Sequence, residues 1–329
     1  MASRRSPPFL DLTPDRILDA VEGAGLRCDG RLFALNSFEN RVYQIGIEDA
    51  PPIVAKFYRP GRWTDAAILE EHGFSAELVA AEVPVVAPLA DPAGRTLIQA
   101  GAFRFAVFPK RPGRAPELDD ENTLEWLGRF IARIHAIGET RAFACRPRVD
   151  IASYGDAPLA YLLRAKVVPQ PLRAAFEAAA RHALDRVRER WREAGAVRSL
   201  RLHADCHAGN ILWTPEGPHF VDLDDCRMGP AVQDLWMLLS GDRAAMTRQL
   251  AAVLEGYRMF RDFDLVELVL LEPLRTLRML HYAAWLAERW HDPAFPAAFP
   301  WFGTERYWQE QILALKEQMA AMDEPALAP

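Results

Sequence analysis

RLHADCHAGNILWTPEGPHFVDLDDCRM, residues 201–228, is the stretch around which the rest of the chain is organised. Its first part has the spacing H-x-D-x-x-x-x-N, in which the aspartate is Asp205 and the asparagine is Asn210. Two short apolar runs, ILW and FV, then flank a turn, and the second run ends in carboxylates that begin at Asp222. This order predicts a β-hairpin. The hairpin would bring Asn210 and Asp222 to the same end of two paired strands, with Asp205 just upstream.

Phosphoryl transfer from ATP needs side chains of these types. One carboxylate must accept the proton of the attacking hydroxyl, and a second carboxylate with an amide oxygen must hold Mg²⁺, which prefers hard oxygen ligands. The same spacing is typical of the catalytic loop of kinases. We therefore expect Asp205 to be the base, Asn210 and Asp222 to bind Mg²⁺, and Asp222 to be catalytic through the metal. The alternative is an acidic loop in which Asp205 and Asn210 make only turn hydrogen bonds. Asp224 could hold or tune a second ion, and this stays open.

A lysine in the middle of an apolar strand, IVAKFY, marks the amino-terminal part of the chain. Three antiparallel strands are expected at 31–36, 41–47 and 53–58, and Lys56 lies in the third. A buried lysine needs an anionic partner. The helix expected at 65–80 offers Glu71 on the face that packs on the sheet. This strand and helix order predicts that Lys56 binds the phosphates of ATP and pairs with Glu71. If Lys56 instead faced solvent, it would not indicate a phosphate-binding site.

The turn SFEN, residues 37–40, lies between the first two strands, where kinases place a loop that covers the phosphates. It contains no glycine, but backbone N–H groups and the Ser37 hydroxyl can still bind phosphate. We therefore expect Ser37 at the ATP site. The alternative is an ordinary hairpin turn.

The composition along the chain predicts two lobes. Residues 1–109 form a nucleotide-binding lobe, 110–116 a linker rich in Pro, Gly and Arg, 117–322 a helical lobe with the catalytic and metal loops, and 323–329 a disordered tail. Helices are expected at 122–137, 170–194, 243–260, 265–288 and 306–322. We expect Asp234, at the start of the helix VQDLWMLL, to brace the catalytic loop or cap its helix. The predicted fold is α+β: a bilobal protein-kinase-like fold with a small, mainly antiparallel β lobe and a larger helical lobe.

Charge and cysteine usage limit the possible partners. Acidic residues exceed basic ones by 45 to 39, which argues against a nucleic-acid or anionic membrane partner. The start MASRRSPPFL lacks the apolar run of a signal peptide, and no apolar stretch is long enough to span a membrane. The four cysteines show no C-x-x-C spacing, so reduced thiols are expected. We expect a cytoplasmic monomer.

Several stretches resemble the stress response kinase A family, within the aminoglycoside phosphotransferase and choline kinase class. They are LNSFENRVYQ (35–44), VAKFYRPGRW (54–63), LHADCHAGNILW (202–213), FVDLDDCRMGPAVQDLWMLL (220–239), EPLRTLR (272–278) and DPAFPAAFPW (292–301). The resemblance covers nearly the whole chain. It implies an ATP- and Mg²⁺-dependent serine/threonine protein kinase of a bacterial stress response, with Asp205 as proton acceptor and Asn210 and Asp222 on Mg²⁺. It also implies that Ser37 lies at the ATP site and is a position for autophosphorylation. Ala204 stands where glycine is expected.

The residues and the resemblance favour different phosphate acceptors. Only nine residues separate Asp222 from the helix that begins at about Val232, and there is no A-P-E motif. Protein kinases normally seat a peptide on a longer segment, so the spacing favours a small acceptor such as an amino alcohol, homoserine or an aminosugar. The resemblance favours a protein Ser or Thr hydroxyl, and we follow it. A nucleotide-binding pseudokinase is the third alternative, and the presence of Lys56, Asp205, Asn210 and Asp222 disfavours it.

Overall fold

The computed structural model describes residues 7–329, and the chain divides into two compact units. One unit contains the chain up to Pro116 together with Ala144–Arg146 and Ala208–Cys226, and the other contains Glu117–Phe143, Pro147–His207 and Arg227–Pro329. The division is therefore not contiguous. We expected the metal-binding residues Asn210 and Asp222 in the helical lobe, whereas the hairpin that carries them belongs to the first unit.

The first unit is built on a five-stranded antiparallel sheet in the order β1-β2-β3-β5-β4. The elements of this unit are α1 (Pro14–Gly23), β1 (Cys28–Ala34), β2 (Arg41–Ile47), β3 (Ala50–Phe57), α2 (Asp65–Ala80), β4 (Ile98–Ala100), β5 (Phe103–Pro109), β7 (Ile211–Thr214) and β8 (Gly217–Phe220). The expected three-stranded meander is confirmed, with β1 beginning three residues earlier than expected. Residues 83–85 form no strand and make only an isolated bridge from Val85 to Phe220. Pro84 cannot donate to a ladder, which limits pairing there.

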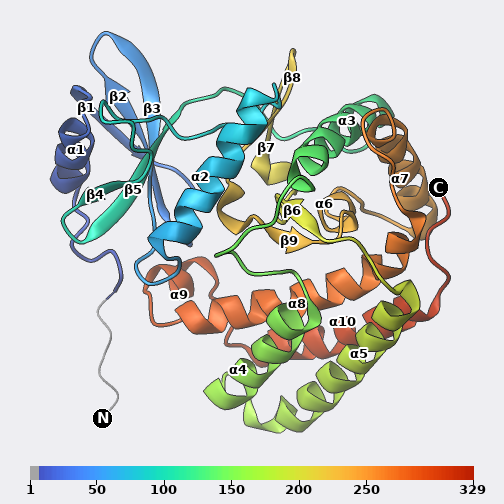
Figure 1. Cartoon of the computed structure of the whole chain (residues 1–329). Helices are drawn as coiled ribbons and strands as arrows, with labels where there is room; N and C mark the ends of the chain where they lie inside the picture. Colours follow the sequence, from blue (N-terminus) through green and yellow to red (C-terminus); the bar gives the residue numbers. More distant parts are fainter. Residues whose placement is uncertain (1–6) are drawn as a thin grey trace. The chain divides into compact units, whose positions relative to one another are not determined.

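The two faces of this sheet carry different side chains. Ile53, Ala55 and Phe57 of β3 belong to the core that α1 covers. Tyr58 packs with Ile68 of α2 on the opposite face. Successive residues of a strand point to opposite faces, so Lys56 lies on the α2 side. Figure 1 shows α1 and α2 on the two sides of the sheet.

The second unit is mainly helical. Its elements are α3 (Glu121–Gly138), a π-helical turn (Ala152–Asp156), α4 (Ala157–Ala165), α5 (Arg173–Ala194), β6 (Leu200–Leu202), β9 (Arg227–Gly229), α6 (Val232–Trp236), α7 (Arg243–Tyr257), α8 (Leu271–Arg289), α9 (Ala294–Ala298) and α10 (Glu305–Asp323). Helix α3 packs against α7, and α8 packs with α4, α5 and α10 (Figure 1). Gly128 and Gly256 permit the close approach of α3 to α7, because a Cβ atom at either position would collide with backbone of the other helix. The helical lobe expected from the sequence is confirmed.

Two helical predictions differ from the structure. The helix expected at 265–288 is a 3-10 segment at Leu265–Leu270 followed by α8. Pro273 lies in the first turn of α8, where its missing N–H needs no partner, and it could not donate within one continuous α-helix. Helix α4, which has Pro158 in its first turn, is not among the helices expected from the sequence.

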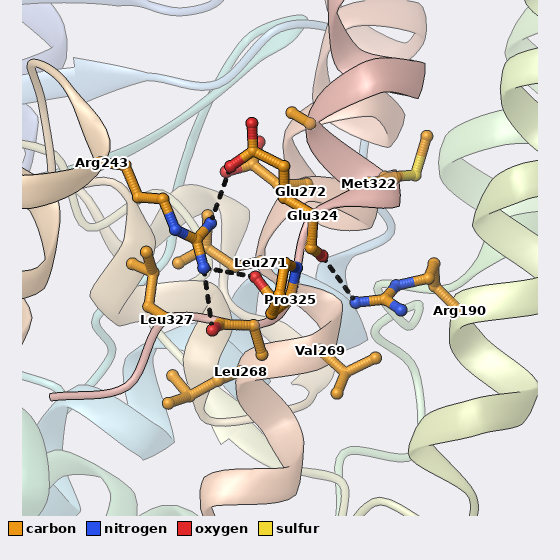
Figure 2. A pocket seen from close by; sticks show the side chains of 12 residues that line it. Arg190, Arg243, Leu268, Val269, Leu271, Glu272, Met322, Glu324, Pro325 and Leu327 are labelled. Carbon is orange, nitrogen blue, oxygen red and sulfur yellow. Dashed lines mark hydrogen bonds and ion pairs between the residues drawn. The ribbon is translucent and has the colours of Figure 1, made fainter.

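The carboxyl-terminal tail is ordered, unlike the disordered tail expected from its composition. The side chain of Arg243 pairs with Glu324 and donates to the backbone oxygens of Pro325 and Ala326. The side chain of Leu327 is buried. These residues and Arg190 line a small pocket at the end of the chain (Figure 2). One guanidinium therefore fixes three successive residues that form no helix or strand.

None of the helices in residues 7–329 has both the length and the apolar composition needed to cross a lipid bilayer.

Candidate functional site

Lys56 is the charged centre of the first unit. Its Nζ atom lies 2.9 Å from Asp222 Oδ1, 3.3 Å from Asp224 Oδ1 and 3.3 Å from Glu71 Oε1. The lysine side chain is only 6% exposed. The register of β3 places it on the face that α2 covers, and α2 supplies Glu71 from its middle. The lysine and glutamate that the sequence singled out are therefore in contact.

The charges of this group are mutually stabilised. Burial by itself lowers the pKa of Lys56, but Asp222, Asp224 and Glu71 outweigh it and raise that pKa well above its ordinary value. Burial likewise acts to raise the pKa of Asp224, and Arg62 and Lys56 overcome it and hold that pKa low. Lys56 is therefore a cation and Asp224 an anion at neutral pH. Burial raises the pKa of Glu71, against the opposing effect of Lys56.

Two arginines complete this cluster, and the sequence analysis did not identify either. Arg62 pairs with Asp224 Oδ2 and lies 2.7 Å from Asp225 Oδ1. Arg146 lies 3.1 Å from Glu71 Oε2 and donates to the backbone oxygens of Asp224 and Cys226. The stretch VAKFYRPGRW contains Arg62, but no periodicity indicates which carboxylate an arginine in a loop will meet. Lys56 and the two arginines together fix α2 and the 222–226 segment within this unit.

The loop that contains Ser37 is held by its neighbours. Ser37 Oγ donates to the Asn40 carbonyl oxygen at 3.2 Å. Arg59 donates through its backbone N–H to Asn40 Oδ1 at 3.1 Å and through its side chain to the carbonyl oxygens of Glu39 and Phe38. The loop is thus anchored by a buried arginine at the end of β3 rather than by glycine. The structure leaves the proposed ATP contact of Ser37 as a prediction.

The predicted hairpin is formed by β7 and β8, which pair from Ile211 with Phe220 to Thr214 with Gly217. The Val221 N–H donates to the Asn210 carbonyl oxygen at 3.0 Å. This contact brings Asn210 to the end of the hairpin from which Asp222 continues. Asp222 adopts a left-handed backbone conformation with φ of 58°. Its side chain is 54% exposed.

Asn210 and Asp222 could hold a magnesium ion whose remaining ligands would be phosphate and water oxygens. Among residues 7–329, no three His, Cys, Asp or Glu side chains converge as a ready-made metal cage. Mg²⁺ does not require one, because it is commonly held by one or two side-chain oxygens together with substrate phosphates. The exposed carboxylate of Asp222 can meet an ion, and the Asn210 amide is a second oxygen donor. Asp224 differs, since Lys56 and Arg62 occupy its two oxygens.

Asp205 belongs to the second unit, on the loop that follows β6. Asp234 braces this loop, as the sequence suggested: its Oδ1 accepts the Ala204 N–H at 2.7 Å and its Oδ2 accepts the His203 N–H at 2.9 Å. The loop needs this support because Ala204 has φ of 65°, which is unfavourable for a residue with a Cβ atom.

Asp234 is in turn held by α3. Its Oδ2 lies 3.0 Å from His135 Nε2, and His135 Nδ1 lies 2.8 Å from the Tyr257 hydroxyl. Burial lowers the pKa of His135, although Asp234 opposes this. His135 is fully buried, and it connects α3 and α7 to the Asp234 brace of the Asp205 loop.

The Asp205 side chain contacts two basic residues of its own unit. Arg278 Nη2, from α8, lies 2.7 Å from Asp205 Oδ1. His207 Nε2 lies 3.6 Å from Asp205 Oδ2. The stretch EPLRTLR drew attention to α8 because of its resemblance to one family, but the sequence analysis assigned no role to Arg278.

Comparison with known proteins identifies the family. The sequence pattern described as "Phosphotransferase enzyme family" matches residues 32–269. The chain belongs to this family. Over 319 residues it is 49% identical to "Stress response kinase A" of Escherichia coli (strain K12), covering 97% of this chain and 96% of that protein. It is 47% identical over the same length to "Serine/threonine protein kinase RdoA" of Salmonella typhimurium (strain LT2). The resemblance stated from the motifs is confirmed.

Solved phosphotransferase structures share the fold. One is described as amicoumacin kinase in complex with AMP-PNP, Ca²⁺ and "Ami". It has a TM-score of 0.73, is 18% identical, and the match covers 96% of this chain and 95% of that one. Another is a microcompartment-associated aminopropanol kinase, with a TM-score of 0.72, 21% identity, and coverage of 93% and 98%. At this identity the likeness establishes the kinase-like fold alone. Together with the family it shows that the chain is a phosphotransferase of the kinase type.

Proposed function

We propose that this phosphotransferase is an ATP- and Mg²⁺-dependent serine/threonine protein kinase of a bacterial stress response. The observation that supports it most strongly is the identity of 47–49% over nearly the full length to proteins named stress response kinase A and serine/threonine protein kinase. The charged cluster around Lys56 and the oxygen donors Asn210 and Asp222 supply the side chains that ATP and a metal ion need.

Each residue has a defined part in this reaction. Lys56, held in its charged form by buried carboxylates, binds phosphate oxygens, and Glu71 positions it. Asn210 and Asp222 would hold Mg²⁺, and the ion would supply neutralisation of the phosphate charge. Asp205 accepts the proton of the acceptor hydroxyl as that oxygen attacks the γ-phosphorus of ATP and ADP leaves. Positioning and charge neutralisation provide most of the rate.

We further propose a cytoplasmic monomer that acts on a protein hydroxyl, without nucleic acid or a membrane as partner. The free state of all four cysteines and the acidic excess support this assignment. Ser37 is the proposed ATP-site hydroxyl and a candidate for autophosphorylation.

A small-molecule phosphotransferase is the second candidate, and one observation favours it. Between Asp222 and α6 the chain forms only a 3-10 turn and the short strand β9. This segment is shorter than the one on which protein kinases normally seat a peptide. A pseudokinase is disfavoured because all four chemically essential side chains are present.

Incubation of the purified chain with γ-labelled ATP and Mg²⁺ tests these alternatives. A generic protein acceptor is supplied in one set of reactions, and amino alcohols or aminosugars in another. We expect label on the chain or on the protein acceptor, and loss of that label in Asp222→Ala. Transfer only to the small molecules would replace the protein kinase assignment. Nucleotide binding without any transfer would favour the pseudokinase.

A further inference from the structure

Arg278 gives Asp205 an unusual neighbour for an enzyme that acts on cationic acceptors. Its guanidinium lies 2.7 Å from Asp205 Oδ1, and its side chain is 30% exposed. Any hydroxyl that reaches Asp205 therefore approaches an ion pair whose positive member is a guanidinium. A carboxylate next to that hydroxyl can accept from the remaining N–H groups of the guanidinium, whereas an ammonium group cannot.

The helix that carries Arg278 supplies no carboxylate in its middle part. Between Glu272 and Glu288, α8 contains Arg275, Arg278 and His281 and no acidic residue. The two glutamates at the ends of this segment are paired with their own arginines, Glu272 with Arg275 and Glu288 with Arg289. The middle of α8 therefore offers no carboxylate for an ammonium group.

Aromatic rings are the other device that binds a cation, and those of α8 already have partners. Tyr282 stacks on Trp285 with ring centroids 5.6 Å apart. The Trp285 ring also contacts the Phe295 ring, with centroids 5.0 Å apart. The guanidinium of Arg289 lies 5.6 Å from the centre of the Trp285 ring. The Trp285 ring is thus already in contact with a cation of the protein itself.

We propose that Arg278 is a specificity-determining residue that selects acidic acceptors: a Ser or Thr in a protein segment with Asp or Glu beside it. This inference rests on the proposed function and names the substrate class for it. An acidic side chain next to the hydroxyl pairs with the guanidinium and places the hydroxyl at Asp205. An amino alcohol or a lysine-rich segment cannot make this contact with the guanidinium.

Two peptides of equal length test this inference with the full-length chain. One has glutamates on both sides of a central serine, and the other has lysines there. We expect the unmodified chain to show a kcat/KM about tenfold higher for the acidic peptide, the size typical of one charge-assisted contact. Arg278→Gln should reduce this ratio to less than about twofold, whereas Arg278→Lys should retain most of it.

Arg275→Gln is the matched control, since it removes the same charge one turn earlier on α8 from a residue that pairs with Glu272. It should leave the ratio unchanged. Because each ratio is measured within one variant, loss of folded protein cannot produce the expected result. Equal ratios in the unmodified chain and Arg278→Gln, or a preference for the lysine peptide, would overturn this inference alone. Label on amino alcohols and on neither peptide would overturn the proposed function, and the acidic protein acceptor with it.

Discussion

Lys56 shows at the scale of single residues how a functional group is kept charged inside a fold. The buried carboxyl groups of Glu71 and Asp224 lie next to it. Lys56→Met should therefore lower the free energy of unfolding by about 3 kcal/mol, because the buried carboxyl groups would lose one of their positive partners. Urea unfolding at neutral pH measures this change, and nucleotide titration should show weaker ATP binding.

Lys316→Met on α10 provides the control, because this lysine is exposed. It should change the free energy of unfolding by less than about 0.5 kcal/mol. Adding Glu71→Gln to Lys56→Met should restore part of the lost stability, since it removes a buried carboxyl group that has lost one of its two positive partners. If Lys56→Met lowered the free energy of unfolding by no more than the control does, the stability of the cluster would not depend on the lysine.

At the scale of elements, Asp234 connects α6 to the loop that carries Asp205. Asn at this position keeps one accepting oxygen where two backbone N–H groups now need one each. Asp234→Asn should therefore lower the free energy of unfolding by about 2 kcal/mol and reduce kcat at least about tenfold, because the Asp205 loop is no longer held. Asp242→Asn is the comparison, since Asp242 caps α7 and Asn caps a helix equally well. If both variants kept full activity, the proposed brace would be unnecessary.

Glu267 makes the contact between the 3-10 segment and α6 dependent on pH. Burial raises its pKa from 4.5 to about 7, although the Val232 N–H donates to it at 2.9 Å. At pH values between 4.5 and about 7, Glu267 is ionised in the unfolded chain and protonated in the folded chain. The contribution of Glu267 to stability is therefore present at low pH and is lost as the pH rises to about 7.

Glu267→Gln should remove this dependence, because the amide oxygen can still accept the Val232 N–H. We expect the difference in the free energy of unfolding between pH 5 and pH 8 to change by about 2 kcal/mol relative to the unmodified chain, with the variant more stable at pH 8. Urea titrations at the two pH values measure it. The same pH dependence in both proteins would show that Glu267 ionises equally in the folded and unfolded states.

At the scale of the whole molecule, the reactivity of the cysteines measures whether both units are folded. Cys206 and Cys226 are buried, and burial raises the pKa of Cys226 to about 12, whereas Cys145 is exposed. Thiolate is the reactive form. We expect a thiol reagent at pH 8 to modify Cys145 rapidly and Cys206 and Cys226 only when the chain unfolds. Cys145→Ser should remove the rapid phase, and rapid modification of three thiols would contradict the burial described.

The parts of this molecule that could be predicted are those in which local pattern and chemistry agree. The hairpin and the three-stranded meander follow from the pattern of apolar runs and turn residues. The Lys56–Glu71 pair follows from the free-energy cost of burying an unpaired charge. Arg62, Arg146 and Arg278 could not be predicted, because an arginine in a loop or on a half-exposed helix face finds its carboxylate only through tertiary packing. The ordered tail was missed for the same reason: Arg243, distant in sequence, supplies the bonds that the tail cannot make itself.

The most direct test of the central claim compares Asp205→Asn with the unmodified chain in both ATP·Mg²⁺ binding and phosphoryl transfer. We predict ATP affinity within about threefold and a kcat at least about 100-fold lower, since a general base contributes about 10²–10⁴ to rate. Asp185→Asn, at an exposed position on α5, should leave both unchanged. Transfer by Asp205→Asn at an undiminished rate would contradict the assignment of Asp205 as the residue that accepts the hydroxyl proton.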